Sequence, residues 1–367
     1  MFRTEQMEIN MGPQHPSTHG VLRLRLRLDG ERVTASRPVI GYLHRGVEKL
    51  AESREYIKIT PYTDRTDYVN AMSGNLAYLG AVEKLCGITV PEKAHFIRVI
   101  MVELNRIASH LLWLGTHALD IGAMSIFLYT FRERESILDL FEAYCGARLT
   151  YNAFRISGVP SDLPPGWAEE CRAFLKLFRE RHKEYEAILT KNRIWLQRTK
   201  DVGYMDAARC VALSVTGPVL RAAGVARDLR KDEPYAIYDQ IDFEVPVSDE
   251  CDTYARYVVR MAEMLESCRI VEQCLARMPS DGPLMSVKGR KMRPRKDEEI
   301  YHAIEGPRGE QAVYLISDGS DRPYRCKMRN ASFANLQALS PMIEGRLVAD
   351  VVTIIGTLDI VLGDSDR

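Results

Sequence analysis

Two histidines stand four residues apart in the segment GPQHPSTHG, residues 12–20. Pro13 and Pro16 prevent a regular helix, so His15 and His19 do not have the spacing of a helical metal-binding pair. No third ligand lies nearby in the sequence, which makes a zinc site a poor interpretation. A rigid loop of this kind suits the presentation of an imidazole at a cavity, whereas the alternative is a histidine that only bonds backbone carbonyls.

Asp120 lies in a long apolar stretch, residues 111–131, whose other ionisable side chains are His117 and Tyr129. An isolated buried carboxylate is very costly, so Asp120 is expected to be paired or protonated. A neighbouring histidine would keep its charge and be oriented by the carboxylate, which is the arrangement of a proton-donating pair. His117, three residues earlier, is the local candidate for that partner.

The segment DRTDY, residues 64–68, ends in a phenol that can donate a hydrogen bond to a substrate carbonyl. Tyrosines in such positions are more often structural, so the sequence alone leaves both roles of Tyr68 open. The cysteines add no redox centre, because no two of the eight are spaced C-x-x-C as in most cluster and zinc sites. We expect free thiols and no metal bound by this chain.

The elements that must position these residues begin with the alternation LRLRLRL at residues 22–28, which predicts a half-buried strand with its leucines inward. Asp29-Gly30 predicts a hairpin turn, and residues 32–40 can return as the partner strand. The arginine face is most simply solvated, and the alternative is contact with an acidic partner subunit.

The period becomes helical from Met72 onward. Thr89-Val90-Pro91-Glu92 has the pattern of a capping box, and apolar residues then line one helical face over residues 97–114. Further amphipathic helices are predicted over residues 167–195 and 249–278, so the middle of the chain is expected to be a helical bundle.

The last third predicts strands at residues 311–317 and 324–329 and a helix around residues 347–355. The expected fold is therefore mixed α+β. Its three regions are an N-terminal β-sheet region (1–71), a central helical bundle (72–278) and a C-terminal α+β region (279–367).

The composition is that of a globular protein, with 367 residues, 46% of them hydrophobic, and 50 basic against 50 acidic side chains. This balance gives no argument for nucleic acid. The basic run at residues 288–296 lacks interleaved aromatic residues, so a solvated loop is favoured over a nucleic-acid or targeting patch. Asp120 and two glycines argue against a membrane span over residues 111–131. No secretory signal is expected at the N-terminus, which favours a reducing compartment.

Six longer motifs occur in a fixed order: GPQHPSTHG (12–20), GYLHRGVEK (41–49), DRTDY (64–68), HALDIGA (117–123), YDQIDFEVP (238–246) and GDSDR (363–367). The series resembles the 49-kDa (D) subunit family of NADH–quinone oxidoreductase, respiratory complex I. That family is similar in fold to the large subunit of nickel–iron hydrogenases, whose two C-x-x-C pairs would fall near Thr60 and Thr63 and near Val361 and Asp364. No thiolates stand there, so the resemblance implies a former metal pocket that takes a quinone.

By this resemblance, His19 and Tyr68 match the two residues that hydrogen-bond the quinone headgroup, and Asp120 matches the acid linked to the histidine. Arg45 and Arg65 match positions that face a [4Fe–4S] cluster in a partner subunit, which supplies the electrons. Many relatives carry a histidine near that cluster where this chain has Thr150, which cannot titrate. The region from 278 to 301 is also shorter than in many relatives.

The resemblance further implies a chain that binds no cofactor itself and works beside the cluster-bearing (B) subunit, the 30-kDa (C) subunit and the membrane (H) subunit. FMN and the iron–sulfur clusters would lie in partner subunits of a proton-pumping complex, with this chain peripheral on the cytoplasmic side of the plasma membrane. Two alternatives stay open: a related complex that takes electrons from ferredoxin or F420, and a non-catalytic scaffold of hydrogenase-like fold.

Overall fold

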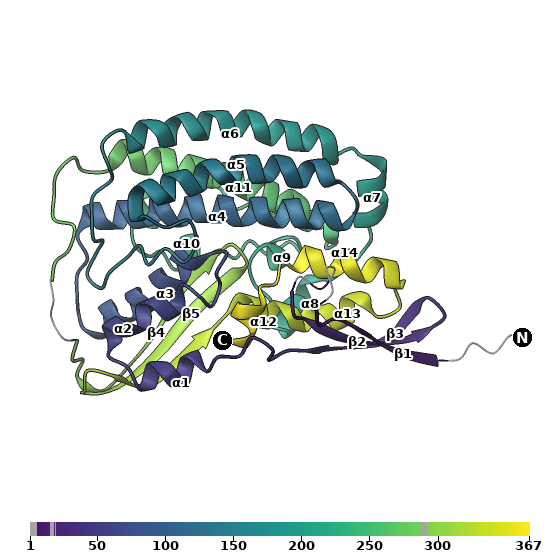
Figure 1. Cartoon of the computed structure of the whole chain (residues 1–367), viewed down its shortest axis with the longest axis horizontal. Helices are drawn as coiled ribbons and strands as arrows, with labels where there is room; N and C mark the ends of the chain where they lie inside the picture. Colours follow the sequence, from purple (N-terminus) through teal and green to yellow (C-terminus); the bar gives the residue numbers. More distant parts are fainter. Residues whose placement is uncertain (1–5, 15–17, 19, 288–291) are drawn as a thin grey trace, which may run out of the picture.

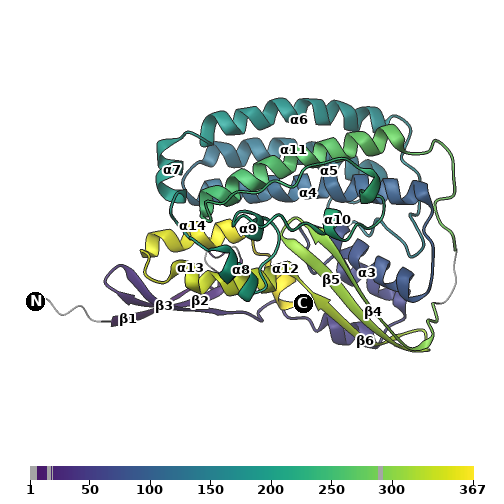
Figure 2. The ribbon, with the colours of Figure 1, turned by 180° about the vertical axis from the view of Figure 1, so that it is seen from behind.

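The computed structural model describes residues 6–14, 18, 20–287 and 292–367. A helical bundle packs on a C-terminal sheet with helices against it, and an N-terminal sheet extends from one end of the body (Figures 1 and 2). The predicted mixed α+β class is confirmed. The boundaries at residues 71 and 278 stay a prediction, and both of the larger apolar cores contain residues from all three regions.

The N-terminal sheet is antiparallel with the strand order β1-β2-β3: β1 (Gln6–Met11), β2 (Arg23–Asp29) and β3 (Arg32–Val39). The predicted strand and hairpin are confirmed, with Gly30 at a positive φ of 59° in the turn. The leucines of β2 are buried and pack in one core with the C-terminal helices, whereas Arg25 turns outward and donates from Nε to Glu8 at 2.8 Å. Contact of this arginine face with an acidic partner stays a prediction.

Long helices run side by side to form the bundle (Figure 1): α4 (Glu92–Asp120), α5 (Met124–Cys145), α6 (Trp167–Leu189) and α11 (Thr253–Arg277). The capping box predicted at Thr89 is wrong, because α4 begins at Glu92 with Pro91 as its N-cap and no side-chain cap. A residue before proline is driven away from the helical region, so Val90 cannot be helical. The helix predicted over residues 167–195 is split, since Asn192 caps a new helix through its side-chain oxygen.

The apolar stretch 111–131 is also divided, with α4 ending at Asp120 and α5 beginning at Met124. Gly122 between them adopts a φ of 98°. None of the helices in the described ranges combines the length and the apolar character needed to span a bilayer.

The C-terminal sheet is antiparallel in the order β4-β5-β6: β4 (Lys296–Gly306), β5 (Gly309–Asp318) and β6 (Pro323–Arg329). Helices from the first part of the chain lie beside it (Figure 1): α1 (Val47–Glu52), α2 (Tyr56–Thr63) and α3 (Ala71–Leu85). Four short helices lie in the segment between α6 and α11: α7 (Arg193–Thr199), α8 (Ala207–Ala212), α9 (Pro218–Arg221) and α10 (Leu229–Asp232). The predicted strands near residues 311–317 and 324–329 are confirmed.

The chain ends in a helical segment: α12 (Ala331–Asn335), α13 (Leu339–Ile343), α14 (Val348–Leu358) and α15 (Leu362–Asp366). The predicted helix near residues 347–355 is α14. All eight cysteines are free thiols, six of them buried and two half-buried, as predicted.

Candidate functional site

The C-terminal segment closes over the segment that carries Tyr68. A Cβ on Gly363 would lie 2.7 Å from the carbonyl oxygen of Thr66 and 3.4 Å from Cε1 of Tyr68, so glycine permits this approach. On the other side, the carboxylate of Asp366 accepts hydrogen bonds from the backbone N–H groups of Gly41 (2.8 Å) and Leu43 (2.7 Å). Segments from opposite ends of the sequence thus pack against one another.

Tyr68 is exposed beside this contact, with 37% of the residue accessible to solvent. Burial of the remainder and the charge of Asp67 both raise the pKa of the phenol above its usual value. The group therefore stays protonated at neutral pH and is able to donate its O–H. Gly20 lies beside the same helix, where a Cβ on it would be 3.8 Å from Leu362 Cδ1 of α15.

Asp120 is the last residue of α4 and is half-buried. The sequence predicted a carboxylate inside an apolar helix, whereas the structure places this carboxylate at the end of the helix. It lies against Gly356 of α14, where a Cβ would be 3.3 Å from Asp120 Oδ2 and 2.4 Å from His117 Nδ1. The last carbonyl groups of a helix carry partial negative charge, which disfavours a carboxylate at this end. A nearby cation would therefore stabilise the carboxylate.

His117, the local partner considered for Asp120, is fully buried. Its ring stacks on Trp113 with centroids 5.5 Å apart and meets the edge of Trp195 at 5.3 Å. Trp113 in turn donates from Nε1 to the carbonyl of Gly356 at 2.9 Å, which ties α4 to α14 at this point. The packing fixes the end of α4 and with it the position of Asp120.

Arg45 and Arg65 lie together at the end of α2, and the chain that follows Thr150 contacts the same turn through Asn152. The guanidinium of Arg45 donates to the carbonyl of Arg65, and the guanidinium of Arg65 donates to the carbonyl of Pro61 at 2.6 Å. Both side chains are exposed. Thr150 lies two residues before Asn152, whose backbone N–H donates to Asp64 Oδ2 at 2.9 Å. The positive charge of both arginines is therefore presented at the surface of this rim.

Asp64 is the buried carboxylate beneath this rim. Burial raises its pKa to about 7, against the opposing effects of the Asn152 N–H and of Arg65. Thr63 next to it donates from its hydroxyl to the carbonyl of Thr60 at 2.8 Å and accepts from Asn75 Nδ2 at 2.9 Å. Hydroxyl and amide groups therefore surround Thr60 and Thr63. Within the part of the chain that the structure describes, no group of three His, Cys, Asp or Glu side chains is arranged to hold a metal ion.

A set of buried charged side chains, which the sequence did not reveal, includes Asp67, the residue before Tyr68. Arg308, in the turn between β4 and β5, donates from one terminal nitrogen to Asp67 Oδ2 at 2.9 Å and from the other to Asp359 Oδ1 at 3.3 Å. The sequence carried little signal for this set, because Asp67 stands in the motif DRTDY, Asp359 lies outside the six motifs, and Arg308 is 241 positions from Asp67.

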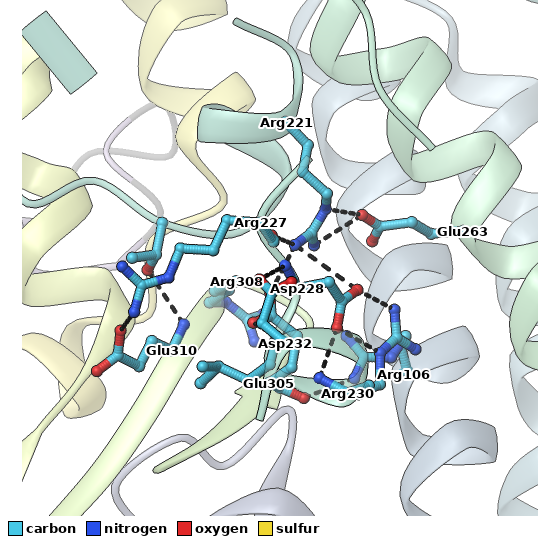
Figure 3. A network of polar contacts seen from close by, with 12 residues as sticks. Arg106, Arg221, Arg227, Asp228, Arg230, Asp232, Glu263, Glu305, Arg308 and Glu310 are labelled. Atoms are coloured by element: carbon cyan, nitrogen blue, oxygen red, sulfur yellow. Dashed lines mark hydrogen bonds and ion pairs between the residues drawn. The ribbon is translucent and has the colours of Figure 1, made fainter. Parts of the chain in front are cut away.

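A second buried network lies between the bundle and the sheet (Figure 3). Arg221 of α9 bonds Glu263 at 2.8 Å and Glu305 at 2.7 Å. Arg230 of α10 bonds Asp228 at 2.7 Å and Glu103 of α4 at 3.2 Å. Ion pairs of this kind fix the relative positions of α4, α11 and β4, and so of the elements that carry the site.

Of the predicted site residues, the structure describes Tyr68, Asp120, Arg45, Arg65 and Thr150, whereas His19 lies outside the described residues. The two arginines lie together, and the chain after Thr150 contacts the same turn through Asn152. Tyr68 and Asp120 are each packed against the C-terminal helices, Tyr68 on α15 and Asp120 on α14. The predicted roles of these residues remain predictions.

Residues 120–298 and 290–367 match the family model described as the 49 Kd subunit of the respiratory-chain NADH dehydrogenase. The second NADH-quinone oxidoreductase D-type subunit of Solibacter usitatus is 56% identical over 99% of this chain and 97% of its own length. The D-type subunits of NADH-quinone oxidoreductase from Geotalea uraniireducens and Bacillus cereus are each 50% identical over the whole of both chains. The chain belongs to this family. As a member of the 49-kDa subunit family it is a subunit of NADH–quinone oxidoreductase, an enzyme complex, and its partners are other subunits of complex I.

Proposed function

We propose that this subunit binds the quinone headgroup between His19 and Tyr68 and takes part in its reduction to the quinol. The observation that carries the proposal is the approach of the C-terminal helix α15 to Tyr68, with Gly20, the residue that follows His19 in the sequence, beside the same helix. A para-quinone has two carbonyl oxygens, and an imidazolium and a phenol supply one donor for each.

The residue types fit the chemistry of the reaction. Reduction of a quinone to a quinol takes two electrons and two protons. The phenol of Tyr68 gives one proton to one carbonyl oxygen, and the imidazolium of His19 gives the other. Asp120 acts through the histidine, because a carboxylate stabilises the charged imidazole before transfer.

The proposal places no electron carrier in this chain. The electrons therefore come from a [4Fe–4S] cluster in the cluster-bearing (B) subunit. Arg45 and Arg65 are the exposed cations that face this cluster. Positive charge beside a cluster stabilises its reduced form and raises its potential. Thr150 stands where a titrating histidine would make that potential depend on pH, so we expect no such dependence through this position.

The proposed assembly is the peripheral arm of a proton-pumping complex on the cytoplasmic side of the plasma membrane. The cluster-bearing, 30-kDa and membrane (H) subunits are the proposed neighbours, and FMN and the iron–sulfur clusters belong to partner subunits. NADH is the proposed source of electrons. Ferredoxin or F420 would be the source if the complex lacked NADH- and FMN-binding subunits.

Replacement of Asp120 by asparagine in the assembled complex tests the proposal. We expect the rate of quinone reduction to fall by about tenfold to a hundredfold, with electron transfer from NADH to ferricyanide unchanged. The alkaline limb of the pH–rate profile is expected to move to lower pH, because the imidazolium loses its stabilising charge.

The matched control is Asp139→Asn on α5, whose side chain is 68% exposed and pairs with Arg148 on the surface. It removes the same charge from the same bundle without altering either rate. Equal quinone rates in the Asp120→Asn and Asp139→Asn complexes would favour a scaffold role for this chain.

A further inference from the structure

A cavity of about 420 Å³ lies between α3, α4 and β4, and none of the predicted site residues lines it. Part of its wall is apolar and is formed by Leu76, Ile88 and Val90. Pockets for small molecules commonly have this size and combine apolar walls with a few polar groups that decide what binds. The polar groups of this wall therefore indicate the class of ligand.

Two of these polar groups are buried nitrogen atoms on the first turns of α4. Arg98 is 1% exposed, and its terminal nitrogens bond the carboxylate of Glu83 at 3.0 and 2.6 Å. Its Nε, like Nδ1 of His95, is buried without a hydrogen-bond partner in the part of the chain that the structure describes. The two residues are three positions apart on one helix, so their side chains are neighbours. Buried polar atoms are nearly always paired, so a hydrogen-bonding ligand in the cavity would satisfy them.

A second imidazole lines the cavity from β4. His302 is 4% exposed, and its ring contacts the edge of Tyr235 with centroids 6.3 Å apart. A Cβ on Gly80 of α3 would lie 2.2 Å from Nε2 of His302. Glycine within a helix lowers its stability relative to alanine, but here it makes the room that the imidazole occupies.

The charges around the cavity favour an anion over a cation. Burial lowers the pKa of His95 to about 4, with Arg98 adding to that effect, and it lowers the pKa of His302 to about 3, with Lys84 adding. Both imidazoles are therefore neutral at pH 7, and each has an N–H to donate. Glu83 balances the charge of Arg98, whereas Lys84 is exposed and forms no ion pair with a described residue.

The start of α4 contributes to the same positive potential. Val90 and His95, on either side of its first residues, both line the cavity. No side chain caps this end of the helix, whose first N–H groups carry partial positive charge. Two imidazoles are also possible ligands of a metal ion, but Lys84 and the helix end oppose a cation here.

We propose that this cavity binds a small carboxylate with an apolar body, such as a medium-chain fatty acid. The carboxylate accepts hydrogen bonds from the N–H groups of His95 and Arg98, and Lys84 is its counterion at the surface. The apolar body lies against the apolar wall. The inference goes beyond the proposed function, because none of these residues takes part in quinone reduction.

Calorimetric titration of the full chain, and of the assembled complex, with octanoate tests the proposal. We expect one octanoate per chain with a dissociation constant of about 0.1–1 mM. Octanamide has the same shape without the charge, and acetate has the charge without the apolar body. Each is expected to bind at least about tenfold more weakly. Equal affinity for octanoate and either analogue overturns the proposal, and so does binding to the isolated chain that is absent from the complex.

Variants of the wall locate the bound carboxylate. Lys84→Met is expected to raise the dissociation constant about threefold to fivefold, because an exposed charge contributes modestly. His95→Leu is expected to raise it about tenfold. The matched control is Lys176→Met, at an exposed position of α6, which is expected to leave the affinity unchanged. Wild-type affinity in the Lys84→Met chain, whose exposed substitution leaves the core intact, overturns the assignment.

A competition experiment separates this site from the proposed quinone site. Excess short-chain quinone is expected to leave the octanoate affinity of the assembled complex unchanged. Displacement of octanoate by quinone would place the carboxylate at the quinone site and overturn the inference. Absence of octanoate binding would also overturn it but would leave the proposed function untouched, since that function is tested by the rate of quinone reduction in the Asp120→Asn complex.

Discussion

Replacement of Tyr68 by phenylalanine in the assembled complex is expected to lower the rate of quinone reduction by about a hundredfold or more. The variant keeps the ring that packs on Gly363 and removes only the hydroxyl, so the loss would be that of a proton donor. Electron transfer from NADH to ferricyanide, which does not need the quinone, is expected to stay at the wild-type rate. Both rates are measured on the same purified complex.

The control is Tyr324→Phe at the exposed start of β6, where the side chain is 67% accessible. It removes a phenol of the same kind from an exposed position outside the motif DRTDY and is expected to leave both rates unchanged. A Tyr68→Phe complex with a normal quinone rate would show that the phenol is structural, the alternative that the sequence left open.

Glu103→Gln is expected to destabilise the full chain by about 3–5 kcal/mol in the free energy of unfolding. Glu103 is completely buried on α4, where it accepts hydrogen bonds from Tyr238 Oη at 2.6 Å and Ser267 Oγ at 2.7 Å. It is also the counterion of Arg106 (3.1 Å) and Arg230 (3.2 Å). A neutral amide at this position removes the negative charge that compensates these two buried guanidinium groups.

The same carboxylate makes stability depend on pH in a predictable direction. Burial by itself would raise the pKa of Glu103, but Arg106 and Arg230 outweigh burial and lower it to about 2 from its usual 4.5. Its contribution is therefore fully present above pH 4.5 and is lost as the pH falls toward 2. Urea unfolding at several pH values measures this dependence, which is expected to be smaller in the Glu103→Gln chain but not absent, because the pKa values of Glu263 and Asp228 are lowered as well.

Glu298→Gln on β4 is the matched control, because its partly exposed side chain pairs with Arg295 only at 3.7 Å. An exposed ion pair contributes little, so we expect a change of at most about 0.5 kcal/mol. Similar free energies of unfolding for the Glu103→Gln and Glu298→Gln chains would mean that the buried network is not what holds α4 to α10.

The sequence was sufficient to predict an element where the local pattern of apolar and polar side chains determines it. The alternation of leucine and arginine in β2 predicts a strand because successive side chains point to opposite faces. The helices of the bundle follow likewise from their apolar faces. The start of α4 was mispredicted because the capping pattern at Thr89 ignored the effect of Pro91 on the residue before it.

Long-range contacts were beyond the sequence. Arg308 and Asp67 are separated by 241 positions, and no local pattern links them. Gly356 gives no sign in the sequence that its missing Cβ lets α14 approach His117 and Asp120. The family resemblance supplied the candidate residues. The buried charges near Tyr68 come from segments that are distant in the sequence, so only the structure shows that they lie together.

A photoreactive quinone tests the binding site most directly. The complex is irradiated with a short-chain azidoquinone and digested, and the labelled peptides are identified by mass spectrometry, with unlabelled quinone as competitor. We predict adducts in residues 12–20 and 64–68 that the competitor removes. Adducts confined to another region, such as the cavity of about 420 Å³ that His95 and His302 line between α3, α4 and β4, would contradict a quinone site at Tyr68.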